Sequence, residues 1–109
     1  MSFSTADHSV SPPHFEIPRL YNAAVDLVER NLAQRAGKLA FIDDAGQYTF
    51  AELADRVNRF GGGLLSLGLT MEDRVLIAMH DSIDWPVAFL GAIKAGIVPI
   101  AINTLLTTQ

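Results

Sequence analysis

The regular spacing of hydrophobic residues after Thr49 is the clearest structural signal in the sequence. Apolar residues recur there at steps of four and three, which predicts one face of a long helix. They are Leu53, Val57, Phe60, Leu64 and Leu67. Thr49 and Glu52 have the spacing of a capping box, in which a hydroxyl and a carboxylate satisfy exposed backbone amides reciprocally. Gly68 follows at the place where a left-handed C-terminal cap is expected.

Two shorter patterns precede this helix. Residues 22–34 carry apolar positions on one helical face, with Asn22 as the expected N-cap. Residues 39–43 and 47–49 are predicted to be strands, joined by a tight turn at residues 44–46. The sequence therefore predicts a helix followed by a β-hairpin.

The C-terminal third predicts a strand, a helix and a second strand. Residues 74–80 include five consecutive apolar residues, and a run without alternation indicates a strand covered on both faces. Asp84 is expected to cap the next helix, with Pro86 in its first turn, and Gly96 to end it. Residues 97–102 predict another buried strand.

These elements predict an α/β fold with three layers, a largely parallel sheet and an N-terminal β-hairpin. Prolines work against regular structure near the start, so we expect residues 1–20 to form a flexible leader and residues 21–109 the α/β portion. The last helix and both late strands are apolar on every side. Each needs neighbours that so short a chain cannot fully supply, so we expect the chain to be part of a larger domain.

Composition supports a folded chain and argues against several functions. The chain has 109 residues, of which 50% are hydrophobic and 18% charged. Its 8 basic and 12 acidic residues give a net charge of −4, whereas a nucleic-acid partner calls for a clustered basic face. Without cysteine there are no disulfides or thiolate metal sites, and no secretory signal opens the chain. We therefore expect a cytoplasmic protein.

Residues 83–102 are long and apolar enough to raise the question of a membrane span. The stretch carries Asp84 and Lys94, and a charge at membrane depth is costly. Two prolines and Gly96 also interrupt it. A helix followed by a strand explains these features better, so no membrane partner is expected.

The glycine cluster Gly61-Gly62-Gly63 invites comparison with a phosphate-binding loop. Such a loop follows a strand, opens a helix and, in the nucleoside-triphosphate form, continues into a lysine followed by serine or threonine. Here the glycines lie inside the predicted helix, and no lysine follows them directly. Close packing of this helix against a neighbour is the interpretation we favour.

Four polar residues follow the two predicted parallel strands. His80 and Asp81 come after the first strand, and Asn103 and Thr104 after the second. Open α/β sheets bind ligands at the carboxyl ends of their strands, so these four are the candidate substrate-binding residues. The alternative is that they form turns before the next elements. The spacing of the three histidines suggests no metal site, and we assign no catalytic residue.

Two segments resemble core motifs of the adenylate-forming enzymes. Residues 48–53, with the helix that ends at Leu67-Gly68, resemble the first motif, and residues 92–100 resemble the second. The longer run 84–107 is similar to benzoate-CoA ligases and their hydroxybenzoate relatives, which are arylcarboxylate-CoA ligases of the acyl-CoA synthetase superfamily. The resemblance covers residues 21–109. It implies that the chain is the N-terminal part of an incomplete adenylate-forming domain.

In the intact enzyme this resemblance implies a two-step reaction. A carboxylate, benzoate or a related aryl acid, attacks the α-phosphate of ATP to give an acyl-adenylate and pyrophosphate. The coenzyme A thiolate then displaces AMP to form the thioester. Mg²⁺ would offset the phosphate charge. The family's phosphate loop, its adenine- and ribose-binding segments and its catalytic lysine have no counterpart in these 109 residues. The chain alone is expected to be inactive and to bind none of these molecules tightly.

Two other hypotheses stay open at this point. The chain could be a self-contained α/β module that binds a nucleotide or an acyl group through its strand-end residues. It could instead be a structural domain that buries its apolar faces against a second copy in a homo-oligomer.

Overall fold

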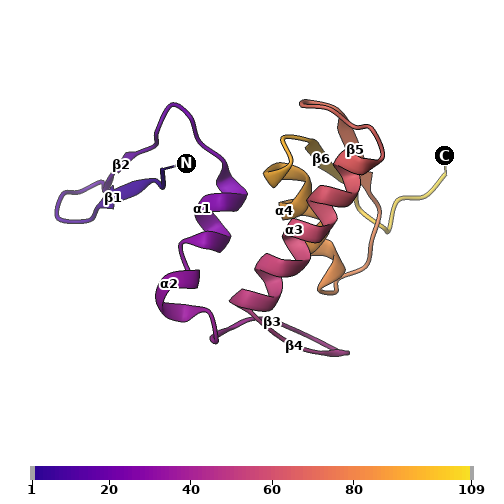
Figure 1. The fold of residues 1–109 in the computed structure, drawn as a ribbon, viewed down its shortest axis with the longest axis horizontal. Helices are drawn as coiled ribbons and strands as arrows, with labels where there is room; N and C mark the ends of the chain where they lie inside the picture. Colours follow the sequence, from indigo (N-terminus) through magenta and orange to yellow (C-terminus); the bar gives the residue numbers. More distant parts are fainter. Residues whose placement is uncertain (1, 109) are drawn as a thin grey trace.

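A computed structural model describes residues 2–108. The helices and strands follow one another along the chain as shown in Figure 1. Their order is β1 (Thr5–Asp7), β2 (His14–Glu16), α1 (Ala23–Glu29), α2 (Leu32–Arg35), β3 (Leu39–Asp43), β4 (Gly46–Thr49), α3 (Phe50–Ser66), β5 (Arg74–Ile77), α4 (Asp84–Lys94) and β6 (Val98–Ala101). No helix in this part of the chain is long and apolar enough to cross a membrane.

The long helix α3 forms where the sequence predicts it. The Thr49 hydroxyl accepts a hydrogen bond from the Glu52 amide at 3.2 Å, and the Glu52 carboxylate reaches back to the Thr49 amide. Gly68 follows the helix with φ +90°, and Gly96 follows α4 with φ +81°. Both glycines have the left-handed conformation that side chains disfavour, so both predicted helix ends are confirmed.

The core lies between α1, α3 and α4. Its largest fully buried side chains are Leu53 and Val57 on α3 and Ile77 on β5. The two long helices approach closely because glycines face each other: a Cβ built on Gly61 would lie 2.9 Å from the Gly91 carbonyl oxygen. The glycine cluster therefore contributes close packing through Gly61, as predicted.

The strands form three separate two-stranded sheets. β3 and β4 pair as the predicted antiparallel hairpin, and β5 pairs with β6 in parallel, with Ile77 opposite Ala101. Helix α4 connects the two parallel strands, so the α/β class and the N-terminal hairpin are confirmed. One face of the parallel pair is open: Ile77 is 1% exposed, but its neighbour Leu76 is 63% exposed. Within the described residues these strands are therefore covered on one face only.

The helix predicted over residues 22–34 is two helices. Asn22 caps the first as expected, since its side-chain oxygen accepts the amides of Ala24 and Val25. At Asn31 the side-chain amide donates to the Leu27 carbonyl at 2.8 Å, and the Asn31 backbone amide turns to Val28. In a continuous helix the Leu27 carbonyl would accept the Asn31 backbone amide. Because the Asn31 side chain occupies this carbonyl instead, the helix is interrupted at Asn31.

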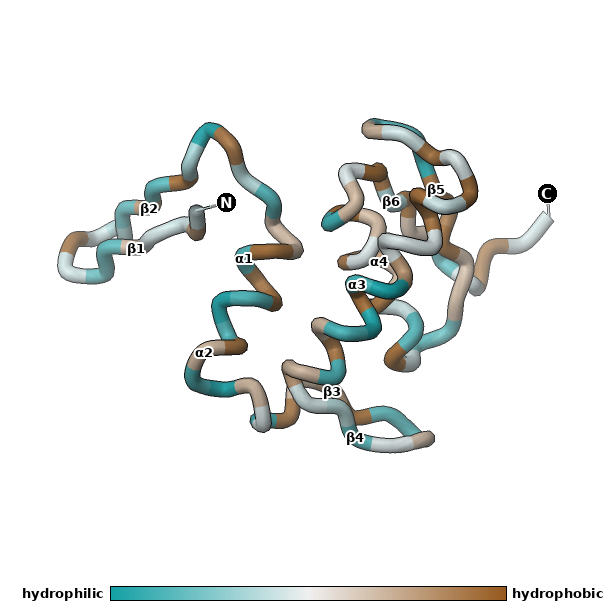
Figure 2. The backbone as a smooth tube through the Cα atoms, in the orientation of Figure 1, coloured by the Kyte–Doolittle hydropathy of each residue, from teal (hydrophilic) through white to brown (hydrophobic). Residues whose placement is uncertain are grey.

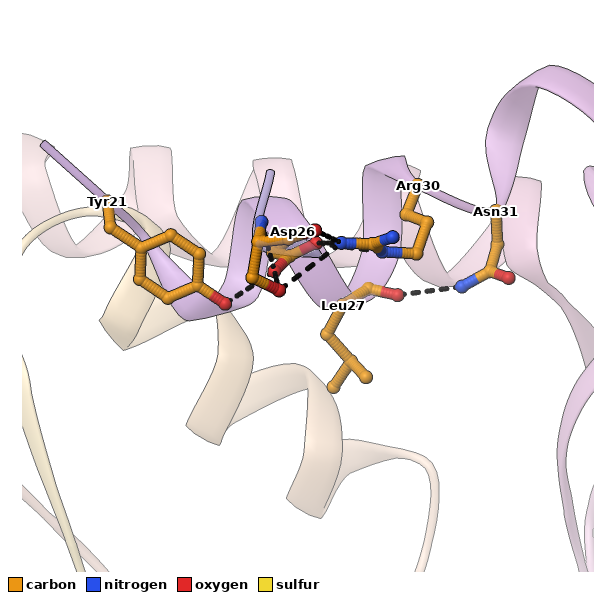
Figure 3. Close-up of polar contacts among 6 residues, drawn as sticks. Tyr21, Asp26, Leu27, Arg30 and Asn31 are labelled. Atoms are coloured by element: carbon orange, nitrogen blue, oxygen red, sulfur yellow. Dashed lines mark hydrogen bonds and ion pairs between the residues drawn. The ribbon is translucent and has the colours of Figure 1, made fainter. Parts of the chain in front are cut away.

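The leader contains two short strands, β1 and β2. β1 and β2 pair as a short antiparallel hairpin that lies apart from α3 and α4 (Figure 1). The buried carboxylate of Asp26 on α1 holds the leader: it accepts the Ser4 amide at 3.1 Å and the Tyr21 hydroxyl at 2.5 Å, and it pairs with Arg30 (Figure 3). The flexibility of residues 1–20 stays a prediction.

Candidate functional site

An apolar groove lies beside the N-terminal half of α4. Its volume is about 650 Å³, and three parts of the chain line it: α1, the β3–β4 hairpin, and α4 with the loop before it. The apolar lining includes Leu27, Phe41, Ile42, Trp85, Phe89 and Leu90. The acidic lining consists of Asp43, Asp44 and Asp81.

Asp43 joins the hairpin turn to the start of α4. One of its carboxylate oxygens accepts the amides of Ala45 and Gly46, each at 2.9 Å, and the other accepts the Ile83 amide at 2.9 Å. The amide of Ile83 holds the pKa of the Asp43 carboxyl below its ordinary value; burial opposes this, and the turn amides add to it. The contact explains why the hairpin sits against α4 and forms one wall of the groove.

The sequence predicted Asp84 as the N-cap of α4, and this prediction is wrong. It is the first residue of the helix, and the N-cap position is Ile83, whose side chain cannot accept a hydrogen bond. The exposed amides are instead satisfied from outside, by Asp43 at Ile83 and by the Ser82 hydroxyl at Asp84. Asp43, which lies 40 residues before Ile83, thus accepts an amide that a local N-cap side chain would otherwise satisfy. A sequence pattern around α4 alone cannot indicate this contact.

Replacing Asp43 by alanine should lower the urea midpoint of unfolding, because the amides of Ile83, Ala45 and Gly46 lose their acceptor. Since the pKa of Asp43 is lowered in the folded state, its contribution is present near pH 7 and is lost as the pH falls below about 4. Urea titrations at pH 7 and pH 3 measure both effects. Asp44→Ala is the control, because the exposed Asp44 carboxylate caps no amide among the described residues; equal midpoints for the two variants would contradict this role.

The aromatic wall of the groove is built on one face of α4. Trp85 and Phe89 are four residues apart and stack with ring centroids 5.1 Å apart and an interplanar angle of 12°. Both are half-buried, so each ring keeps part of its surface open to the groove. With three carboxylates around these rings, the groove suits an apolar or cationic group and repels a phosphate.

The structure places the four predicted strand-end residues beyond the carboxyl ends of the paired strands β5 and β6. The pairing of β5 and β6 continues beyond the strands, since the Ile102 amide donates to the Ile77 carbonyl at 3.1 Å. His80, Asp81, Asn103 and Thr104 all follow this point and all are exposed. Asp81 lines the groove, whereas the Asn103 side chain accepts the Leu105 amide at 2.8 Å and so forms a turn. A binding role for the four stays a prediction.

Sequence reasoning missed most of the groove. From the sequence, residues 44–46 are predicted only as a tight turn, and neither Asp43 nor Trp85 is given a role in binding. The available signal was the pairing of Trp85 with Phe89 at helical spacing, next to an acidic turn. Among residues 2–108, the structure groups no three side chains suited to hold a metal ion.

Comparison with known proteins gives a consistent result. A family model described as AMP-binding enzyme matches residues 28–109. The chain is 61% identical over 108 residues to the benzoate–CoA ligase of Thauera aromatica, covering 97% of this chain and 20% of that protein. It is 50% identical over 92 residues to the 4-hydroxybenzoate–CoA/benzoate–CoA ligase of Rhodopseudomonas palustris, covering 84% of this chain and 17% of that protein.

A solved structure agrees with these relatives. The benzoate CoA ligase from Burkholderia xenovorans matches with a TM-score of 0.77 and 50% identity, over 81% of this chain and 18% of that one. The chain thus spans about a fifth of the length of the proteins it matches. Since the family model covers most of its residues, the chain belongs to the AMP-binding enzyme family.

Proposed function

We propose that the chain is the N-terminal part of an ATP-dependent ligase that joins benzoate, or a related aryl carboxylate, to coenzyme A. The observation that carries this proposal is the identity to benzoate–CoA ligase along nearly the whole chain, 61% over 97% of its residues. In the whole enzyme the carboxylate attacks the α-phosphate of ATP, forming an acyl-adenylate and releasing pyrophosphate, and the coenzyme A thiolate then displaces AMP to form the thioester. Such an enzyme would act in the cytoplasm and serve aromatic degradation.

The chain's own part in this reaction is to support the rest of the domain. The parallel pair β5–β6 exposes a row of apolar side chains on one face, among them Leu76, Val98 and Ile100. Covering these side chains would remove a large apolar area from water, which stabilises the covered state. We therefore assign the face to contact with the remaining four-fifths of the ligase.

The phosphates and the metal belong, in this proposal, to residues outside this chain. The groove beside α4 is lined by three carboxylates and no basic residue, which opposes binding of a triphosphate. The described residues also group no three side chains of the metal-ligating types. The 109 residues alone should therefore bind neither ATP nor coenzyme A tightly.

A chimera tests the proposal. Residues 21–109 replace the matching segment of the Thauera aromatica ligase, and benzoyl-CoA formation is measured. Because the exchanged segment contributes packing and no reacting group, kcat/KM should stay within about tenfold of the parent, roughly 1.4 kcal/mol of transition-state stabilisation. The 109 residues alone should give no ATP–pyrophosphate exchange with benzoate.

Two outcomes would contradict the proposal. A folded but inactive chimera would show that the segment is incompatible with a benzoate ligase, and exchange by the 109 residues alone would place the chemistry inside them. The second candidate, a self-contained binding module, rests on the groove beside Trp85. Calorimetric titration of the chain with ATP, coenzyme A and benzoate separates the two, since that candidate requires saturable heat with at least one.

A further inference from the structure

A single carboxylate joins the two ends of the leader. Oδ2 of Asp26 accepts the Ser4 amide at 3.1 Å and the Ser4 hydroxyl at 2.5 Å, and it also accepts the Tyr21 hydroxyl at 2.5 Å. Arg30 adds to this junction, because its guanidinium donates to the Ser4 carbonyl at 2.7 Å. Residues 5–20 therefore form a loop whose two ends meet at Asp26 (Figure 3).

The loop has few other contacts with the chain. Every residue of β1 and β2 is exposed, and among the described helices and strands these two contact only each other. A cavity of about 480 Å³ lies between the hairpin and α1, with Phe15 and Leu27 in its lining. Ile17 and Leu20 are 65% and 79% exposed, and Figure 2 shows hydrophobic and hydrophilic positions alternating between β2 and α1. Apolar packing therefore contributes little to the position of the loop.

The hairpin inside this loop is too short to be stable by itself. β1 and β2 pair over three residues each, from Thr5 opposite Glu16 to Asp7 opposite His14. An isolated two-stranded hairpin is marginally stable at best in water. Closing a loop also costs chain entropy, which the contacts that close it must offset. The order of the loop therefore depends on the contacts at Asp26.

We propose that residues 5–20 switch as one unit between an ordered loop, closed by the contact of Ser4 with Asp26, and a disordered loop in which Ser4 is released. The rest of the described chain keeps its fold in both states, because the core between α1, α3 and α4 includes no residue of the loop. Release opens the cavity beside α1 to solvent. The flexibility that the sequence predicts for the leader belongs to the released state.

The first test is ¹⁵N relaxation of the 109-residue chain, which measures backbone order residue by residue. In the wild type, the order parameters of residues 5–7 and 14–16 should exceed about 0.8. The double variant Phe3→Ala/Ser4→Pro lacks both Ser4 donors and the ring over which the Arg30 guanidinium lies. The same order parameters should then fall below about 0.6, whereas those of α3 should stay unchanged.

Two variants serve as controls for this measurement. Ser4→Thr keeps the backbone amide and a hydroxyl, so its loop should stay as ordered as that of the wild type. Ser2→Pro places a proline two residues earlier, at an exposed position whose amide donates no hydrogen bond within residues 2–108. It should also leave the loop ordered.

The second test uses a synthetic peptide of residues 2–20, which does not depend on the folding of the rest of the chain. The peptide lacks Asp26 and Arg30, so nothing closes its loop. We expect no nuclear Overhauser contacts between residues 5–7 and 14–16 of the peptide, although the sequence of both strands is complete.

Several results would overturn the proposal. A loop that is already disordered in the wild type, or one that stays ordered in the double variant, would show that Ser4 and Asp26 do not control it. A hairpin that forms in the peptide would show that it needs no closing contact. A loss of order that spreads to α3 would show that the loop is not a separate unit. None of these readouts requires turnover, so the proposal stands or fails independently of the CoA ligase function.

Discussion

Replacing Gly91 by leucine is expected to lower the free energy of unfolding by about 3 kcal/mol, since overpacking a tight contact forces the elements apart. A Cβ at this position would lie 2.9 Å from Cδ1 of Phe60 and 3.1 Å from the Val57 carbonyl oxygen. The first neighbour is a half-buried ring and the second is helix backbone, so neither can move aside without separating α3 from α4. Urea unfolding followed by circular dichroism measures the loss.

Gly62→Leu is the matched control for this prediction. Gly62 lies in α3 next to the contact residue Gly61, but a Cβ there would meet no atom within 4 Å. Because leucine is a better helix former than glycine, this variant should gain up to about 1 kcal/mol. A loss at Gly91 no larger than the change at Gly62 would show that the close approach of the two helices does not limit stability.

Local signals in the sequence were sufficient to predict the helix ends. The capping box at Thr49 and the glycines at positions 68 and 96 act within four residues of the backbone groups they satisfy. Such short-range chemistry is fully visible in a sequence. The break at Asn31 is also local, but the apolar pattern continues across it, and only the competing side-chain bond to Leu27 interrupts the helix.

The groove could not be predicted in the same way, because its walls come from distant parts of the chain. Leu27, Asp43 and Trp85 belong to three different elements, and the contact that brings the hairpin to α4 joins Asp43 to Ile83. Hydrophobic periodicity indicates which residues face inward, but not which distant loop meets them. The exposed face of β5–β6 shows the same limit: a run of apolar residues indicates a strand buried on both sides, but the described residues cover only one of its faces.

The buried carboxylate of Asp26 is expected to make a large contribution to the stability of the fold. Its side chain is buried, with 7% of its surface exposed, and it is the centre of a network that includes Ser4, Tyr21 and Arg30 (Figure 3). Burial raises the pKa of its carboxyl, but the hydrogen bonds from these three residues outweigh burial and hold the pKa well below its ordinary value. The network therefore requires a charged carboxylate.

Replacing Asp26 by alanine should lower the free energy of unfolding by about 2 kcal/mol at pH 7, because hydrogen bonds to a charged group are lost and their donors stay partly buried. Asp55→Ala is the matched control. Asp55 also pairs with an arginine four residues later, at 2.9 Å, but both side chains are mostly exposed, so its loss should cost no more than about 0.5 kcal/mol. Urea titrations of both variants give the comparison.

The effect of Asp26 should depend on pH in one direction. The folded-state pKa lies below the ordinary value of 3.8, so the unfolded chain binds more protons as the pH falls through that value. The stabilisation is therefore complete above about pH 5 and declines steadily below pH 4, where wild type and Asp26→Ala should converge. A difference between the two that stays constant from pH 7 to pH 2 would mean that the carboxylate stabilises the leader by its shape and packing, and not by its charge.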